Sequence, residues 1–111
     1  MRNHTRNFVR AWHGHRHERK WVTVLSGAAL ICCIAVDDWD NPSKDLSVQR
    51  FVLSEGNPAL LEIPGGFVNG SMSLTDGAAI CYFSDSLINS AAEDDIRFDA
   101  RFWDPWEVQE R

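Results

Sequence analysis

The residues best suited to chemistry are gathered in one short segment, residues 10–20, which reads RAWHGHRHERK. His13, His15 and His17 alternate with other residues there, and in an extended strand alternate side chains share one face. A neutral imidazole can remove an acidic proton from carbon, and a nearby Lys or Arg can stabilise the enolate that forms. Three imidazoles with the carboxylate of Glu18 are also a ligand set for zinc, iron or manganese. The segment therefore indicates a general base beside cations, a metal site, or a solvated basic loop.

A second motif, IPGGFVNG at residues 63–70, contains one proline and three glycines. Pro64 fixes one bend, and the glycines allow backbone conformations that other residues rarely adopt. The motif predicts a hairpin that aims Asn69 toward a pocket, or else a turn with no further role.

The remaining sequence consists of short apolar runs separated by Gly, Pro, Asn and Asp turn signals, without a sustained helical period. Extended segments are predicted at residues 8–12, 21–25, 28–36, 48–53, 59–63, 67–74 and 78–84. The aromatic and acidic tail at 91–111 is predicted to be irregular, with at most one helical turn at its start. Short strands in this arrangement are typical of an all-β sandwich or barrel, here one domain over residues 1–111. Exposed sheet edges in so small a domain favour a homodimer that covers them.

Composition and charge disfavour nucleic-acid and membrane partners and favour a cytoplasmic protein. The chain of 111 residues has a net charge of −5, which disfavours nucleic acid as a partner. The apolar run 22–36 is shorter than the roughly 20 residues that cross a bilayer, so we expect buried strands and no membrane contact. The three cysteines lack metal-ligand spacing, which favours reduced thiols in a cytoplasmic protein. Residues 1–20 carry six Lys or Arg against one Glu, which favours an anionic ligand there or attraction to the acidic residues 85–111.

The two motifs together resemble those of the cupin superfamily. The first cupin motif, HxH followed by E and G, has its counterpart in His13, His15, Glu18 and Gly27. The second, PxGxxH, has its counterpart in Pro64, Gly66 and Asn69. The last position of the second motif supplies a metal ligand in a cupin, and Asn is a poor ligand for such metals. The departure at Asn69 disfavours a metal-dependent cupin, so no metal or cofactor is expected.

Five segments are similar to motifs of the dTDP-4-dehydrorhamnose 3,5-epimerase family, a metal-independent branch of the cupins. The family patterns are RGxH, KxVxVxxG, VAVD, IPxGFxHG and DIRxD, and their counterparts here are residues 10–13, 20–27, 34–37, 63–70 and 95–99. The resemblance implies a cupin-like jelly-roll β-sandwich. It also implies a nucleotide-sugar epimerase that acts on a dTDP-4-keto-6-deoxyhexose in deoxysugar and cell-surface polysaccharide biosynthesis. A 3,4-ketoisomerase of the same fold and a non-catalytic sugar-nucleotide-binding cupin remain as alternatives.

The same resemblance implies roles for individual residues. His13 would remove the proton next to the 4-keto group, and Lys20 would stabilise the enolate oxygen. Tyr82, the only tyrosine, would return a proton on the opposite face from the base. Arg10 would meet the diphosphate. The full set of expected substrate-binding residues is Arg10, His15, Arg16 and Asn69.

Neighbouring charges are expected to tune the base. Arg10, Arg16 and Arg19 should disfavour the protonated form of His13. In the family, a His occupies the position of Asn69, and the Asp that orients the catalytic His lies beyond the matched motifs. Asp99 or an acid at 37–40 is therefore considered for that orienting role.

Overall fold

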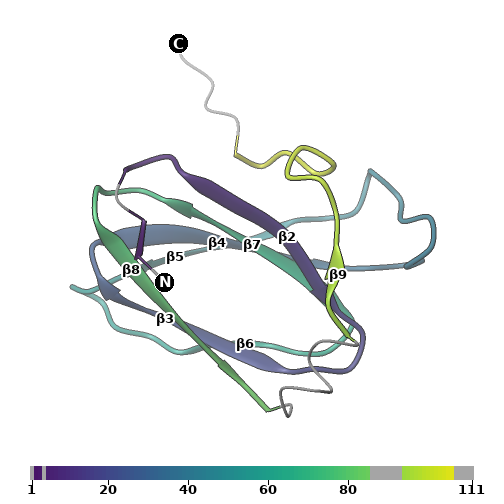
Figure 1. Cartoon of the computed structure of the whole chain (residues 1–111), viewed down its shortest axis with the longest axis horizontal. Coiled ribbons are helices and arrows are strands. Elements are labelled where there is room, and N and C mark those ends of the chain that lie inside the picture. The colour runs from purple at the N-terminus through teal and green to yellow at the C-terminus, as the bar shows by residue number, and fades with distance from the viewer. Residues whose placement is uncertain (1, 4, 86–93, 107–111) are drawn as a thin grey trace.

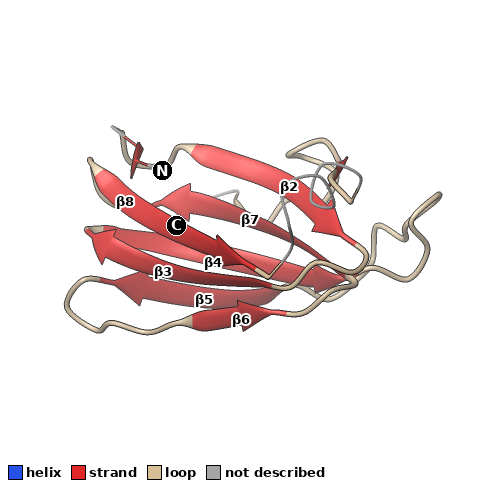
Figure 2. Ribbon diagram, turned by 60° about the horizontal axis from the view of Figure 1, so that its bottom comes forward, coloured by secondary structure: helices blue, strands red, loops and turns tan. Residues whose placement is uncertain are grey.

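The computed structural model describes residues 2–3, 5–85 and 94–106, in which all regular structure is β-strand (Figures 1 and 2). The strands are β1 (Arg2–Asn3), β2 (Val9–His15), β3 (Lys20–Ser26), β4 (Ala28–Ala35), β5 (Gln49–Ser54), β6 (Leu61–Ile63), β7 (Phe67–Ser73), β8 (Ala78–Ser84) and β9 (Ile96–Arg97). The extended segments predicted from the sequence correspond to β2 through β8, and the all-β prediction is confirmed. Within the described ranges, no helix is long and apolar enough to cross a membrane.

The strands form two antiparallel sheets that face each other. One sheet has the order β1-β8-β3-β6 and the other β5-β4-β7-β2-β9. In Figure 1, β3 and β6 run along one side of the molecule and β4, β7 and β2 along the other. Apart from β9, this order is that of an eight-stranded jelly roll. The connection from β2 to β3 therefore passes from one sheet to the other.

Glycines permit the tight turns at one end of the sandwich. Gly27 joins β3 to β4 with a φ of 72°, and Gly77 ends the loop before β8 with a φ of 70°. These positive φ values favour glycine, because a Cβ atom clashes with the backbone there. At Gly27 a Cβ would also meet the Thr75 hydroxyl. Gly27 thus lies between the extended segments predicted at 21–25 and 28–36, and Gly77 between those predicted at 67–74 and 78–84.

Apolar side chains fill the space between the sheets. In β3 they alternate, with Val22 and Val24 buried and Thr23 between them less so. This is the pattern of a strand with one face against a core. The buried residues of this core are Val22, Val24, Ala29, Ile31, Cys33, Leu53, Ile63 and Ile80. His13 and Lys20 are not members of this core, and the region around them is lined by polar side chains.

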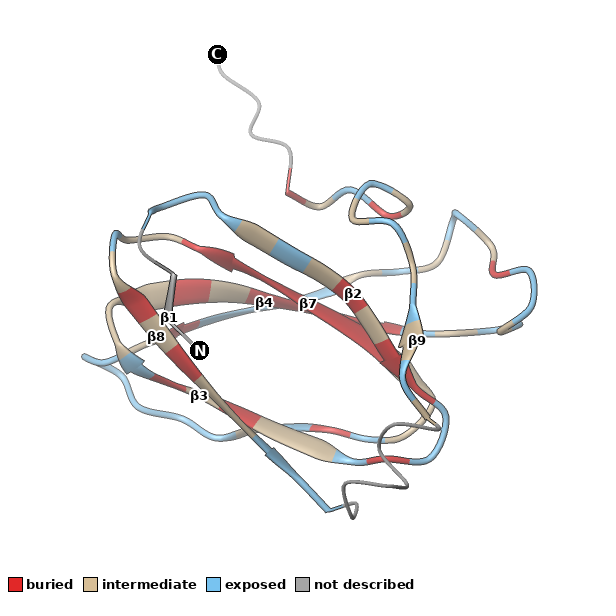
Figure 3. Ribbon diagram, in the orientation of Figure 1, coloured by how far each residue is buried: buried red, intermediate tan, exposed pale blue. Residues whose placement is uncertain are grey.

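A second core lies on the outer face of the five-stranded sheet. Its buried members are Trp12, Cys32, Ile34, Val68, Met72, Trp103 and Trp106. The segment after β9 brings two of these tryptophans against Trp12, whose Nε1 donates to the Trp103 carbonyl oxygen at 3.0 Å. Because both faces of this sheet are covered, the central strands β4 and β7 are mostly buried (Figure 3). Residues 94–106 of the predicted irregular tail are therefore part of the fold, and the helical turn expected at the start of the tail lies outside the described residues.

The adjacent cysteines of β4 point to opposite faces, as predicted for a strand. Cys33 belongs to the core between the sheets and Cys32 to the outer core. Burial raises the pKa of the Cys32 thiol to about 11 and that of Cys33 to about 12. All three cysteines are free. Such buried, protonated thiols are poor nucleophiles, which supports a packing role for Cys32 and Cys33.

Candidate active site

A pocket of about 190 Å³ between the two sheets gathers five of the residues singled out from the sequence. They are Arg10, His13, Lys20, Asn69 and Tyr82. β2 and β7 supply three of them from the five-stranded sheet, and β3 and β8 supply two from the four-stranded sheet. A molecule held in this pocket would therefore meet chemically different groups on its two sides.

The pairing of β2 with β7 places Asn69 beside the candidate base. His13 lies directly opposite Asn69 in this ladder, after a shift in register between Arg10 and His13. The Asn69 side chain is buried, and its Nδ2 donates to the His13 carbonyl oxygen at 3.3 Å. The hairpin motif thus does aim Asn69 into a pocket, where it also holds the backbone of His13 in place.

The environment of His13 favours the neutral imidazole. Burial is the largest cause that lowers the pKa of His13 below its usual 6.5, followed by the positive charge of Arg97. Lys20 lowers it further, whereas Asp95 opposes the shift. The direction is the expected one, but these cations differ from the arginines of segment 10–20 that the sequence indicated. A neutral imidazole at neutral pH is the form able to accept a proton.

Two of the charges that act on His13 are supplied by Arg97 of β9 and by Asp95 just before it, and the sequence did not predict this placement. β9 pairs with β2 so that Arg97 lies opposite His13. Arg97 Nη2 lies 3.2 Å from Asp95 Oδ2, so the positive and the negative charge that act on the pKa of His13 are paired with each other. Asp99, considered from the sequence as an orienting acid, instead accepts a hydrogen bond from the backbone nitrogen of Arg101. The DIRxD resemblance marked this segment, but a two-residue strand has no periodicity that predicts its pairing.

Lys20 and Tyr82 face the pocket from the four-stranded sheet. The Lys20 ammonium lies 6.0 Å from the centre of the Tyr82 ring. Burial is the largest cause that raises the pKa of Tyr82, with Cys33 adding to it, while Ser71 and Arg10 act in the opposite direction. The phenol therefore stays protonated at neutral pH and can donate a proton.

Two predicted substrate-binding residues do not line the pocket. His15 is only 5% exposed, and its Nδ1 lies 2.9 Å from Glu18 Oε2. The Arg16 guanidinium lies outside, 5.9 Å from the centre of the Trp39 ring. The pocket does not include these two residues, because β2 ends at His15 and the chain turns away, and their contact with substrate stays a prediction.

The same turn separates the histidines that the alternation had grouped. His17 follows the end of β2 and is exposed, so it does not share a face with His13. In the part of the chain that the structure describes, no group of three or more His, Cys, Asp or Glu side chains is arranged to hold a metal ion.

The pH at which kcat/KM falls on the acid side of its pH profile should depend on the charges around His13, because these charges set the pKa of the base. We expect Arg97→Gln to move this acid limb of kcat/KM to higher pH, because it removes a cation that lowers the pKa of His13 and frees Asp95. Activity carried by a neutral base is lost as pH falls through its pKa, so a higher pKa means earlier loss. Arg101→Gln, in an exposed pair with Asp104, is the matched control and should leave the limb in place. If Arg97→Gln leaves the acid limb of kcat/KM in place, Arg97 does not set the pKa of the base, and the prediction is wrong.

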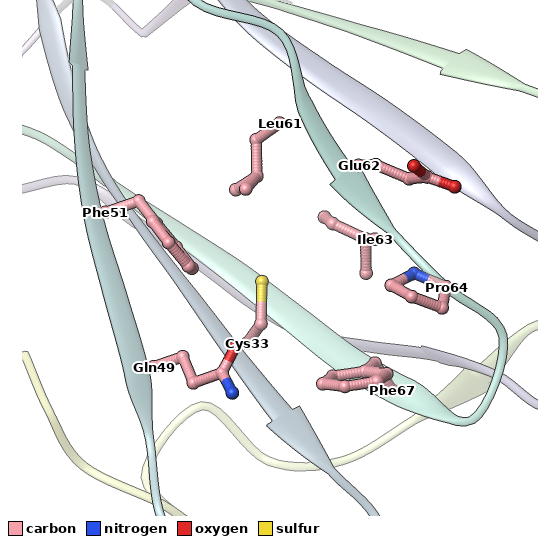
Figure 4. Close-up of a pocket in the computed structure, with 8 residues that line it drawn as sticks. All are labelled: Cys33, Gln49, Phe51, Leu61, Glu62, Ile63, Pro64 and Phe67. Atoms are coloured by element: carbon pink, nitrogen blue, oxygen red, sulfur yellow. The ribbon is translucent and has the colours of Figure 1, made fainter.

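A second pocket, of about 250 Å³, opens between the edge strands β5 and β6 (Figure 4). Its lining is mostly apolar, and the thiol of Cys33 points into it among Phe51, Leu61, Ile63 and Phe67. The high pKa of Cys33 keeps this thiol protonated. The second pocket therefore offers apolar surface rather than proton-transfer groups.

Two sheets in jelly-roll order, with a histidine, a lysine and a tyrosine facing one pocket between them, define a protein of the cupin type. A family model described as dTDP-4-dehydrorhamnose 3,5-epimerase matches residues 1–109. The chain belongs to this family. The family resemblance of the sequence motifs and the jelly-roll prediction are thereby confirmed.

Solved structures share the fold. The dTDP-4-dehydrorhamnose 3,5-epimerase of Bacillus anthracis, with TDP and PPi bound, is 20% identical over 99% of this chain, with a TM-score of 0.78. The enzyme of Legionella pneumophila, in complex with dTDP-4-keto-L-rhamnose, is 20% identical over the full chain, with a TM-score of 0.75. That of Sulfolobus tokodaii is 24% identical over 90%, with a TM-score of 0.72. The chain spans 64%, 59% and 56% of these three proteins, respectively. No curated protein matched the sequence.

Proposed function

We propose that this protein is a nucleotide-sugar epimerase that acts on a dTDP-4-keto-6-deoxyhexose in deoxysugar and polysaccharide biosynthesis. The observation that carries the proposal is the placement of His13 and Tyr82 on opposite sheets around one pocket. Lys20, from the same sheet as Tyr82, lines this pocket too. Family membership supports the substrate class, as do the TDP and the dTDP-4-keto-L-rhamnose bound to two relatives.

In this proposal His13 removes the proton on the carbon next to the 4-keto group. The neutral imidazole accepts the proton, and the electron pair of the C–H bond moves onto the keto oxygen to form an enolate. The Lys20 ammonium stabilises that oxygen, and a cation aimed at developing charge in a partly dry pocket contributes several kcal/mol. The lowered pKa of His13 keeps the base unprotonated at neutral pH.

Tyr82 then returns a proton to the same carbon from the other face. Its phenol comes from the four-stranded sheet, whereas His13 comes from the five-stranded sheet. Removal from one face and return on the other inverts the carbon, which is epimerisation. Arg10 at the pocket supplies a positive charge for the diphosphate, and Asn69 offers an amide for a sugar hydroxyl or keto group.

The proposal is tested by incubating the protein with dTDP-4-keto-6-deoxyglucose in deuterated water and following the sugar by NMR. We expect deuterium at C3 and C5 with inversion at these carbons. Deuterium at C3 alone, with a moved carbonyl group, would indicate a 3,4-ketoisomerase instead. Binding of the substrate without incorporation at any carbon would overturn the enzymatic proposal in favour of a sugar-nucleotide-binding protein, the alternative that the Asn69 departure motivates.

We also propose that the protein is a homodimer. The edges of both sheets, β5 and β6, are open on the same side, with the apolar second pocket between them. Val52 and Leu60 expose more than half of their surface there. Unpaired, apolar edges favour pairing with another chain. Sedimentation velocity should show a species of about twice the chain mass at micromolar concentration, and a monomer at every concentration would contradict the proposal.

A cytoplasmic location completes the proposal. Its support is the free state of Cys32, Cys33 and Cys81, which is typical of a reducing compartment. Fractionation of the source cells should recover the protein with cytoplasmic markers, and recovery from an extracytoplasmic fraction would contradict this location.

A further inference from the structure

A polar bridge, buried at His15 and Glu18 and exposed at Ser84, crosses between the sheets beside the pocket. Nδ1 of His15, at the end of β2, lies 2.9 Å from Glu18 Oε2, and Glu18 Oε1 accepts a hydrogen bond from the Ser84 hydroxyl of β8. Glu18 is buried, although both neighbours of Glu18 in the sequence are not. We call these three side chains, His15, Glu18 and Ser84, the Glu18 bridge.

The contacts of His15 fix which nitrogen carries a hydrogen. Both groups within 2.9 Å of Nδ1, the Glu18 carboxylate and the Asp94 carbonyl oxygen, are acceptors. Nδ1 is therefore the donor, and its hydrogen bond runs to the Asp94 carbonyl oxygen. Glu18 Oε2 faces the same nitrogen as a close charge contact and has no hydrogen bond of its own within the described residues. The Nε2 of His15 is buried and has no hydrogen-bond partner within residues 2–3, 5–85 and 94–106. Moving the buried Glu18 carboxylate away from the His15 ring and the Ser84 hydroxyl would leave both of its oxygens without a partner, which is costly, so the bridge resists stretching.

The bridge lies in register with the proton-transfer groups. His15 follows His13 by two positions in β2, and Ser84 follows Tyr82 by two positions in β8. Side chains two positions apart in a strand share a face, so each end of the bridge lies next to one of the two groups. The bridge therefore spans the same gap between sheets that separates His13 from Tyr82.

The turn that carries Glu18 is itself held in place. The Asp94 carboxylate accepts hydrogen bonds from the backbone nitrogens of Arg16, His17 and Glu18 at 2.8–2.9 Å. Burial alone would raise the pKa of Asp94, but these backbone hydrogen bonds hold it below its usual value. The turn joins β2 of one sheet to β3 of the other, and so fixes the path from His13 to Lys20.

We propose that Glu18 is a positioning residue, whose bridge from His15 to Ser84 sets the separation of β2 and β8 at which His13 and Tyr82 face the two sides of one substrate carbon. The inference rests on the proposed epimerase function. It assigns to Glu18 and His15 a role between the sheets rather than contact with substrate or metal.

The test separates proton removal from proton return. In Glu18→Ala, His13 keeps its ladder with β7 and β9, so deuterium from solvent should still enter recovered substrate. Inversion needs Tyr82 at the right distance as well, and a displacement of about 1 Å can cost about 100-fold in rate. We expect the ratio of inverted product to exchanged substrate to fall by about 10-fold or more, with kcat falling by about 100-fold and KM changing little. Glu18→Gln, which can still accept from one partner and donate to the other, should restore most of the ratio.

Two further variants control the measurement. Glu62→Ala removes an exposed acid of β6 that pairs with Arg19 at 3.2 Å, and it should leave the ratio unchanged. Ser84→Ala removes one end of the bridge and leaves the buried His15–Glu18 pair intact, so it serves if Glu18→Ala does not fold. It should shift the ratio in the same direction by a smaller amount.

If Glu18→Ala or Ser84→Ala lowers deuterium exchange and inversion by the same factor, the bridge only stabilises the fold. This outcome would overturn the inference. If the wild-type protein neither exchanges nor inverts the substrate, the proposed function fails on its own. Crystal structures of the wild type and Ser84→Ala then decide the positioning role, which predicts a wider gap between β2 and β8 in the variant. An unchanged gap would overturn it.

Discussion

Replacing His13 with Asn should lower the rate of solvent deuterium incorporation into the proposed 4-keto-sugar substrate by about 1000-fold or more. Asn is polar and of similar size, but its amide cannot accept a proton from carbon. Asn69 Nδ2 bonds to the backbone oxygen of residue 13, so that contact does not depend on the replaced side chain. NMR detection of deuterium at C3 and C5 measures the loss directly, and binding of the dTDP moiety should change little.

His17→Asn is the matched control for the base. His17 lies four residues away, outside the pocket and exposed, so its replacement should leave the exchange rate within a few-fold of the wild type. Near-normal turnover in His13→Asn would place the base elsewhere and would remove the main support for the proposed site.

The strands could be predicted because their signals are local. β3 alternates buried valines with less buried residues, and Gly27 ends it with a turn that needs a positive φ. The same local signals predicted an extended segment that ends at Trp12, whereas β2 continues to His15. Glycine carries little strand propensity, so it is the pairing of residues 13–15 with β7, and of residues 13 and 14 with β9, that extends the strand.

The pocket was predicted in large part, because motif resemblance marked His13, Lys20, Asn69 and Tyr82. Its surroundings could not be predicted, because they depend on contacts between distant segments. Asp95 and Arg97 reach His13 only through the pairing of β9 with β2. The role of Glu18 depends likewise on a turn whose three backbone nitrogens bind Asp94, far along the sequence. Neither composition nor spacing contains this information.

The C-terminal aromatics show the same limit. The sequence predicts an irregular aromatic and acidic tail at 91–111 and does not say where Trp103 and Trp106 pack. The structure buries both against Trp12 on the outer face of the five-stranded sheet, away from the pocket. Packing there holds the segment that supplies Arg97, so a part of the chain without regular structure still contributes to the electrostatics of the base.

Replacing Lys20 with Met should lower kcat by roughly 100-fold while KM changes far less. Met keeps an apolar stem of similar length, so the packing near Tyr82 persists and only the ammonium is removed. The enolate oxygen carries its full negative charge only after the proton has left carbon. A cation that acts on that oxygen therefore stabilises the transition state more than the bound substrate.

The measurement must separate this effect from a change in the base. Lys20 also lowers the pKa of His13, so the variant should lose activity at a higher pH than the wild type as pH falls. Rates are therefore compared at pH 8, well above the usual pKa of histidine near 6.5, where His13 is neutral in both proteins. Lys44→Met, which changes the only other lysine of the chain, is the control and should leave kcat unchanged. A loss confined to KM would make Lys20 a substrate-binding residue, and the charge on the enolate would then need another partner in the pocket, for which Arg10 is the remaining cation.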